Sequence, residues 1–141
     1  MIRAYVDTNV FLDYFFDRKE PSKHLGEHAY QFFRLAMSGK IEVLISILVL
    51  KELEGKIDQS FINHMLETIL FHKIIHITEK DLIRARILKG KSLSDTLHLV
   101  LALKGQADCL VTRNKKDFNE FSYLLRILFP EEVQSTFSSS H

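Results

Sequence analysis

Short apolar runs alternate along this chain with longer segments of helical spacing. The short runs are mostly β-branched or aliphatic and cover residues 2–6, 41–46, 73–77 and 108–112, with a fifth candidate at 124–129. Runs of this length that lack a polar face are typical of strands buried on both sides. They predict a sheet of four to five strands, mainly parallel, whose two faces are covered by helices.

Between these runs, apolar residues recur every three to four positions, as expected for helices that pack one face against a sheet. The predicted helices follow the first strand to residue 16 and then cover 22–37, 47–57, 61–71, 79–90 and 94–104. Gly39 and Gly105 are natural stops, and Thr78 with Asp81 three residues later indicates a helix start. The alternation of strands and helices predicts an α/β fold, a three-layer α/β/α domain.

The composition supports one globular domain. The chain has 141 residues, of which 46% are hydrophobic and 26% charged, so it can bury a sizeable core. No repeat, linker or change in composition divides it. We therefore expect a single domain over residues 1–135, followed by a short polar and flexible C-terminal tail over 136–141.

Charge and cysteine content limit the classes of partner and compartment. The 19 Lys and Arg nearly balance the 18 Asp and Glu, so strong non-specific attraction to nucleic acid is not expected and any polyanion must bind a local patch. The single cysteine, Cys109, lies in an apolar run and cannot form an intramolecular disulfide. No signal peptide and no membrane-spanning stretch is evident, so a cytoplasmic protein is expected.

Four acidic residues lie near the ends of predicted strands or on the helices that come after them. Asp7 comes directly after the first strand, Glu52 about two helical turns after the second, Asp95 in the first turn of a helix, and Asp117 five residues after the fourth strand. Open α/β sheets bind ligands where the carboxyl ends of their strands meet. Carboxylates that converge there need a cation, and hard oxygen ligands suit Mg²⁺ or Mn²⁺. Such a site can hydrolyse the phosphodiester backbone of a nucleic acid.

Each acid also has a purely structural interpretation. Asp7 is as well suited to cap a helix as to bind a ligand. Glu52 competes with Glu54, which points about 200° away on a helix. Asp95 fits a capping arrangement with Ser92, and Asp117 fits a turn that begins at Asn114.

Several polar residues near the same strand ends are candidates for supporting roles. Thr8, Asn9, Ser46 and Thr112 can orient carboxylates or simply cap helices. Arg113, Lys115 and Lys116 form the best basic cluster for phosphate contacts, although charge runs are usually solvated faces. His98 is expected to pack beside the site without a catalytic role. The pairs His24 with His28 and His72 with His76 lack a recognisable third metal ligand.

Four motifs in this order resemble those of PIN-domain nucleases over nearly the whole chain. They are residues 6–10 around Asp7, 45–53 around Glu52, 94–99 around Asp95, and 110–118, which contain both Asn114 and Asp117. The resemblance implies an endoribonuclease that depends on Mg²⁺ or Mn²⁺, as in the toxin of a toxin–antitoxin pair. Asp7, Glu52 and Asp95 match three acidic positions of that family. Some members carry the fourth acid where this chain has Asn114, and others where it has Asp117.

Two other functions remain open on the sequence. In the first, Asn114 marks lost catalysis, and the chain is a degenerate domain of the same fold that binds RNA or a protein. In the second, Asp7 opens the motif of an aspartyl-nucleophile phosphatase of the haloacid-dehalogenase type, with Asn9 in place of the general acid. The resemblance also implies an antitoxin partner, and Phe11, Phe15 and Phe16 permit a homodimer.

Overall fold

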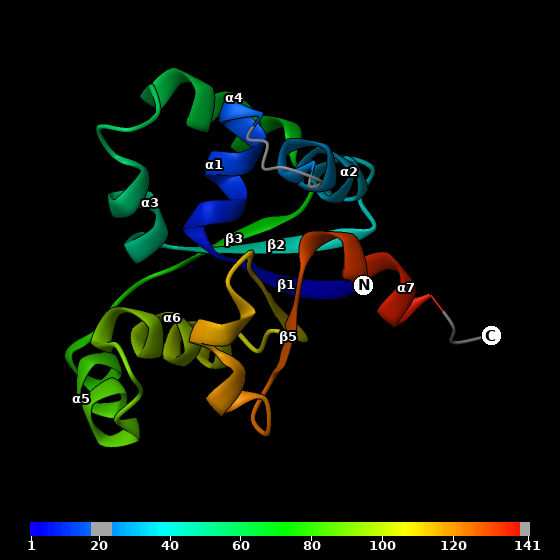
Figure 1. Ribbon diagram of the computed structural model, residues 1–141. Helices are drawn as coiled ribbons and strands as arrows, with labels where there is room; N and C mark the ends of the chain where they lie inside the picture. Colours follow the sequence, from blue (N-terminus) through cyan, green and yellow to red (C-terminus); the bar gives the residue numbers. More distant parts are fainter. Residues whose placement is uncertain (18–23, 139–141) are drawn as a thin grey trace.

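The computed structural model describes residues 1–17 and 24–138, and its centre is one five-stranded sheet (Figure 1). The strands are β1 (Ile2–Val6), β2 (Ile41–Ser46), β3 (His72–Ile75), β4 (Cys109–Val111) and β5 (Arg126–Leu128). Their order is β3-β2-β1-β4-β5, and all neighbouring pairs are parallel. The predicted parallel sheet is therefore confirmed, with five strands.

Helices cover both faces of this sheet. One face carries α1 (Thr8–Phe16), α2 (Leu25–Met37) and α4 (Gln59–Thr68), and the other carries α5 (Glu79–Leu88) and α6 (Leu93–Lys104), as Figure 1 shows. The short helix α3 (Ile47–Leu53) begins where β2 ends. The three-layer α/β/α arrangement predicted from the hydrophobic pattern is present.

Burial on both faces explains the apolar strands. Ala4, Tyr5 and Val6 of the central strand are all fully buried, as are Val43, Leu44 and Ile45 of β2. Because successive side chains of a strand point to opposite faces, a strand without a polar alternation requires cover on both. Cys109 is buried at the start of β4, as expected for a core residue. Burial raises the pKa of its thiol to about 12, so this thiol is inert.

Some element boundaries differ from the sequence prediction. The helix expected over 47–57 ends at Leu53, because Glu54 is extended with ψ of 131° and Gly55 takes the left-handed conformation with φ of +80°. The third strand was expected over 73–77 but covers His72–Ile75. Its last pair joins Ile75 to Ser46, the final residue of β2, so pairing stops where its neighbour strand stops.

The end of the chain carries structure that the pattern did not predict. Helix α7 (Val133–Phe137) includes the first two residues of the expected tail. Phe137 packs against the core, and the Arg126 guanidinium lies 5.4 Å from the centre of its ring. Residues 139–141 of the expected tail lie outside the described part of the chain.

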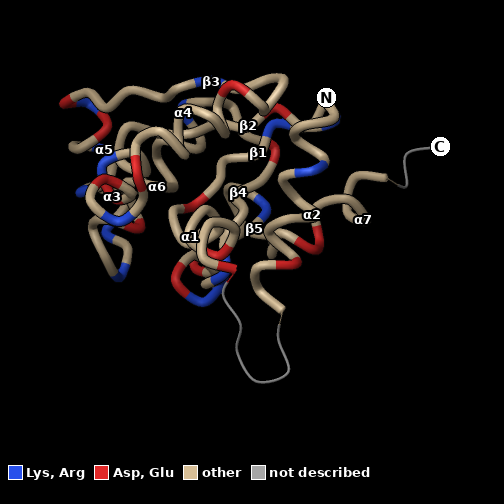
Figure 2. The backbone as a smooth tube through the Cα atoms, turned by 90° about the horizontal axis from the view of Figure 1, so that it is seen from above, with Lys and Arg blue, Asp and Glu red and all other residues tan. Residues whose placement is uncertain are grey.

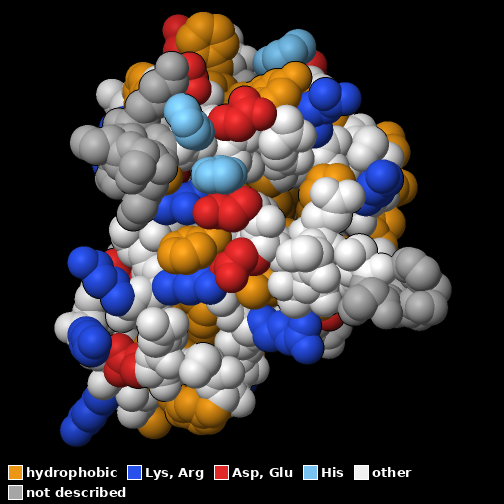
Figure 3. Space-filling view, turned by 45° about the vertical axis from the view of Figure 1, so that its right-hand side comes forward, with side chains coloured by type: hydrophobic (Ala, Val, Ile, Leu, Met, Phe, Trp, Pro, Cys, Tyr) orange, Lys and Arg blue, Asp and Glu red, His pale blue; other side chains and the backbone are white. Residues whose placement is uncertain are grey.

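The described part of the chain contains no helix that could span a membrane, and the net charge of the sequence is close to zero. Within residues 1–17 and 24–138, no helix combines the length and apolar character needed to cross a bilayer. Acidic and basic positions are interspersed along the chain in Figure 2, and both signs alternate on the face seen in Figure 3. This pattern agrees with the near-zero net charge and restricts any polyanion to a local site.

Candidate metal centre

The strand order creates a crevice beside the central strand. From β1 the chain adds β2 and β3 on one side, and β4 and β5 on the other. In parallel sheets the ligand site lies at the carboxyl ends of the strands where this reversal occurs. Here that point lies between β1 and β4, directly before Asp7 and Thr112. The backbone N–H of Asp7 donates to the carbonyl of Val111 at 2.9 Å, which ties the two strand ends together.

Asp7 is both a helix cap and a buried carboxylate of this crevice. Its Oδ1 accepts from the backbone N–H of Thr8 at 2.8 Å, and its Oδ2 accepts from the hydroxyl of Thr112 at 2.8 Å. Burial raises the pKa of the Asp7 carboxyl, although charge on His98 and these hydrogen bonds oppose the rise. The cap therefore fixes the carboxylate without removing it from the site.

Glu52 reaches the same place from α3. Its Oε1 accepts from the Thr8 hydroxyl at 2.5 Å and is 2.9 Å from Nε2 of His98, while the Ser94 hydroxyl lies 3.5 Å from Oε2. Burial acts to raise the pKa of Glu52, but these hydrogen bonds outweigh it and lower the pKa below the usual value. Glu54 is exposed, so the structure brings Glu52 and not Glu54 into the crevice.

His98 is embedded among these acids. Its Nε2 also lies 3.8 Å from Oδ1 of Asp7, and its Nδ1 is hydrogen-bonded to the hydroxyl of Tyr5 at 2.7 Å. Burial acts to lower the pKa of His98, but the hydrogen bond to Glu52 and the charges of Asp7, Glu52 and Asp95 raise it overall. The histidine expected only to pack beside the site is part of it.

Asp95 and Asp117 lie close enough to each other for their charges to interact, and Asp95 also feels the charges of Asp7 and Glu52. Asp95 lies in the first turn of α6, where its backbone N–H donates to the Ser92 hydroxyl at 3.3 Å. Burial raises the pKa of Asp95, and the nearby charges of Asp117 and Asp7 raise it further. Asp117 is half-buried in the 3₁₀ turn η1 (Lys115–Asp117), whereas Asn114 before it is exposed.

This donor set fits a divalent cation. Single ligand atoms of Asp7, Glu52 and His98 all lie within 4.8 Å of one another. Asp95 is close enough to Asp7, Glu52 and Asp117 for their negative charges to raise its pKa. Carboxylates that raise one another's pKa are stabilised when a cation enters. The two carboxylate oxygens of Asp7 each accept one hydrogen bond within the protein and each keep a second lone pair for an ion.

Comparison with known proteins identifies the family of this fold. A family model described as PIN domain matches residues 3–116.

The chain belongs to the PIN-domain family. This membership confirms the resemblance and leaves the phosphatase alternative without support. Among solved structures, the PIN domain is similar to a chain of a toxin–antitoxin complex from Klebsiella pneumoniae, with 23% identity and a TM-score of 0.65, covering 90% of this chain and 97% of that one. At this identity the likeness shows the shared fold. No curated protein matches the chain.

Three other predicted residues have structural tasks beside the acids of this PIN domain. Thr112 holds Asp7 and also accepts from the backbone N–H of Asn114 at 3.1 Å. Asn9 accepts the backbone N–H of Arg113 at 3.2 Å, which fixes the loop after β4 to the start of α1. Ser46 caps α3 by accepting from Val49 and contacts the Tyr5 hydroxyl at 2.7 Å.

The basic cluster predicted to contact RNA is divided by the structure. Arg113 makes a bidentate pair with Glu131 at 3.0 and 2.7 Å and lies 3.8 Å from Asp13, a buried acid that the sequence reasoning did not single out. Lys115 pairs with Glu132 at 2.5 Å. Lys116 is exposed. Two of the three predicted phosphate contacts are therefore already neutralised by acids of the C-terminal segment.

Tyr5 and His98 are the site residues that sequence reasoning missed or set aside. Both had a periodic signal. Tyr5 is two residues before Asp7, so the two share one face of the strand, and His98 is three residues after Asp95, so those two share one face of the helix. Neither signal was decisive, because a tyrosine in a strand and a histidine in an apolar helix are ordinary core residues.

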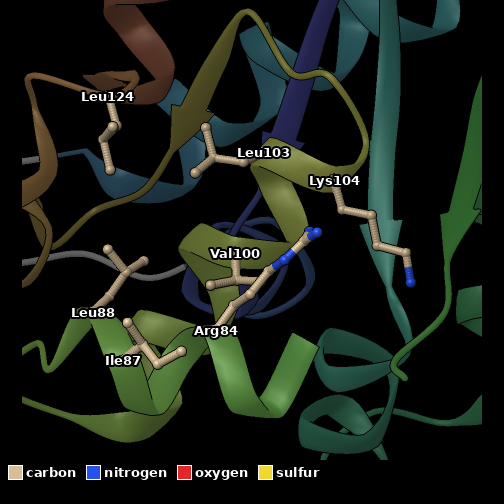
Figure 4. A pocket seen from close by; sticks show the side chains of 7 residues that line it. All are labelled: Arg84, Ile87, Leu88, Val100, Leu103, Lys104 and Leu124. Carbon is tan, nitrogen blue, oxygen red and sulfur yellow. The ribbon is translucent and has the colours of Figure 1, made fainter. Parts of the chain in front are cut away.

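An apolar pocket lies away from these acids. It has a volume of about 410 Å³ between α5, α6 and the segment before β5, and Figure 4 shows Arg84 and Lys104 beside its aliphatic side chains. Those aliphatic residues are Ile87, Leu88, Val100, Leu103 and Leu124. It contains no carboxylate, so the acidic crevice and not this pocket is the candidate for chemistry.

Proposed function

We propose that this PIN domain is a metal-dependent endoribonuclease that hydrolyses RNA phosphodiester bonds. The observation that carries the proposal is that ligand atoms of Asp7 and Glu52 lie within 4.8 Å of one another, with Asp95 close enough for both of their charges to raise its pKa. Such an arrangement is costly unless a cation is present. Mg²⁺ or Mn²⁺ is the ion that oxygen donors favour.

Asp7, Glu52 and Asp95 would hold the ion, with Asp117 as a fourth acid. When bound, a divalent ion of this kind activates water and stabilises the oxygens of a phosphodiester during in-line displacement. The protein contributes rigid placement. Thr8 donates from its backbone to Asp7 and from its hydroxyl to Glu52, so one residue sets two carboxylates. Thr112 fixes the other oxygen of Asp7.

We also propose that the protein is the toxin of a toxin–antitoxin pair, with an antitoxin protein as its partner in the cytoplasm. The similarity of fold to a chain from a toxin–antitoxin complex supports this role. A homodimer is compatible with the surface of α1. Phe11 is in the core, but Phe16 is 55% exposed, and Phe15 lies 6.4 Å from the exposed ring of Phe61.

The central test is cleavage of a labelled single-stranded RNA by the purified chain. We expect cleavage with Mn²⁺ or Mg²⁺ and none with chelator. Asp7→Asn and Asp95→Asn should each lower the rate at least about 100-fold, because loss of a carboxylate that holds the ion removes several kcal/mol of transition-state stabilisation. Glu54→Gln is the matched control, because Glu54 is exposed and lies two residues from Glu52. This variant should cleave RNA at the wild-type rate.

The opposite outcomes are equally clear. Cleavage that persists with chelator or in both aspartate variants contradicts the proposal. RNA that binds without being cleaved, with or without metal, identifies the chain as the non-catalytic RNA-binding domain considered above. Loss of activity in Glu54→Gln as well would indicate that the carboxylates act through folding.

A further inference from the structure

His98 differs in its surroundings from the other histidines of residues 1–17 and 24–138. It is 2% exposed, whereas His24, His64, His72 and His76 are exposed and His28 is half-exposed. Both of its ring nitrogens are engaged, Nδ1 by Tyr5 and Nε2 by Glu52. An imidazole buried among carboxylates can form ion pairs with them or can bind a metal together with them.

The helical spacing places this imidazole beside a proposed metal ligand. Asp95 and His98 are three residues apart on α6, so their side chains leave the same face of the helix. An acid followed by a histidine at this spacing binds metal in carboxylate centres of helical bundles. The sequence Asp95-Thr96-Leu97-His98 thus presents one oxygen donor and one nitrogen donor toward the crevice.

The distances between donor atoms suit one shared ion. Nε2 of His98 lies 2.9 Å from Oε1 of Glu52 and 3.8 Å from Oδ1 of Asp7. Donors about 2.1 Å from a common ion are about 3 Å apart when they subtend a right angle, and farther apart at wider angles. The three atoms therefore have the spacing of ligands that share a coordination sphere.

Tyr5 supplies the partner that a metal-binding histidine needs. Such histidines donate their second ring N–H to a fixed acceptor, which orients the ring. The fully buried Tyr5 hydroxyl is 2.7 Å from Nδ1 of His98 and 2.7 Å from the Ser46 hydroxyl. Because a hydroxyl can donate or accept, Tyr5 can accept from Nδ1–H while it donates to Ser46. Nε2, which faces Glu52 in this structure, would then bind an ion through its lone pair after releasing its own proton.

We propose that His98 is a nitrogen ligand of this centre, oriented by Tyr5, and that the centre consequently selects Mn²⁺ over Mg²⁺. Imidazole binds first-row transition ions well, whereas Mg²⁺ prefers oxygen donors alone. The inference rests on the proposed function, because it assumes that the acidic crevice binds a divalent ion. Beyond that function, the inference assigns Nε2 of His98 as a further ligand and Mn²⁺ as the preferred ion.

Pulsed electron paramagnetic resonance of the Mn²⁺-loaded protein tests the ligand directly. A nitrogen bound to Mn²⁺ gives a ¹⁴N modulation of the signal, which we expect in the wild type. His98→Gln should abolish it, because the amide can still donate to Glu52 but offers no imidazole nitrogen. We also expect His98→Gln to weaken Mn²⁺ binding about 10- to 100-fold and Mg²⁺ binding much less, measured by calorimetry.

Two further variants separate coordination from structure. His64→Gln changes an exposed histidine on α4 and should leave the modulation and both affinities unchanged. Tyr5→Phe removes the hydroxyl that contacts Nδ1 of His98 but leaves the imidazole in place. The ¹⁴N modulation should therefore persist, while Mn²⁺ binds about tenfold more weakly. Thermal unfolding followed by circular dichroism checks that each variant is folded.

The outcomes distinguish this inference from the proposed function. Mn²⁺ that binds and supports RNA cleavage without ¹⁴N modulation overturns the role of His98 alone. An unchanged ratio of Mn²⁺ to Mg²⁺ affinity in His98→Gln does the same, and leaves His98 as a residue that only positions Glu52. Absence of Mn²⁺ binding to the wild type overturns both proposals.

Discussion

Arg113 and Lys116 lie three residues apart in a segment that looks uniformly basic, but the structure gives them different surroundings. The Arg113 side chain is only 14% exposed and forms a bidentate pair with Glu131, which ties the end of β4 to the C-terminal segment. The side chain of Lys116 is exposed. At the level of single residues, equal charge therefore does not mean equal function.

This difference gives a paired prediction. Arg113→Gln should destabilise the fold by about 1–3 kcal/mol, since charge-assisted hydrogen bonds to Glu131 are lost, as measured by urea unfolding. Lys116→Gln should leave the free energy of unfolding unchanged. If Lys116 contacts phosphate, its variant should instead reduce the salt dependence of RNA binding by about one unit of slope. A stable Arg113→Gln variant that fails to bind RNA would reverse these assignments.

The start of α5 shows how elements on one face are joined. Oδ2 of Asp81 accepts from the backbone N–H of Thr78 at 2.8 Å and from Nζ of Lys104, at the end of α6, at 2.8 Å. Burial acts to raise the pKa of Asp81, but the bonds from Lys104 and Thr78 outweigh it and lower the pKa. One carboxylate thus caps one helix and attaches it to the next.

We expect Asp81→Asn to destabilise the domain by about 1–2 kcal/mol at pH 7, through loss of the ion pair and a weaker cap. Because the pKa of Asp81 is lowered by folding, its stabilisation is present above the ordinary value of about 3.9 and is lost as the pH falls through the folded value. The difference between variant and wild type in urea unfolding should therefore shrink below about pH 4. Glu79→Gln, which changes an exposed acid in the same helical turn, is the matched control and should reduce the free energy of unfolding at pH 7 by less than Asp81→Asn does.

For the molecule as a whole, two acids of this centre, Asp7 and Asp95, oppose stability until a cation binds, because folding raises their pKa. The pKa of Asp95 is raised by burial and by Asp117 and Asp7, so at pH 7 its charge destabilises the folded state. Asp95→Asn should therefore raise the unfolding temperature of the metal-free protein. Mn²⁺ at about 100 times its dissociation constant should stabilise the wild type by about 2.7 kcal/mol and this variant by less.

Calorimetric measurement of the unfolding temperatures of the wild type and of Asp95→Asn, with and without Mn²⁺, checks this prediction. The exposed variant Glu54→Gln should behave as the wild type in both conditions. Two results would show that charge repulsion does not govern this centre: a lower unfolding temperature of Asp95→Asn than of the wild type without metal, or an equal stabilisation of the two proteins by Mn²⁺.

Sequence by itself determined the layers and the position of three acids. A strand buried on both faces must be apolar throughout, so the runs before Asp7 and Glu52 predicted a covered parallel sheet without any knowledge of contacts. Parallel strands end at a common edge, and therefore an acid directly after a strand, such as Asp7, and one in the next helix, such as Glu52, are expected near one another. Boundaries such as the end of α3 were less certain, because local backbone conformation at Glu54 and Gly55 decides them.

Only the tertiary structure decided what surrounds each charge. Arg113 and Glu131 are eighteen residues apart, and Tyr5 and His98 are ninety-three apart, so no local pattern relates them. Whether a polar side chain is a ligand, a cap or a core residue depends on burial and on partners brought in by other segments. For this reason the sequence placed Asp7 in a site, whereas the fold alone brought His98 into it.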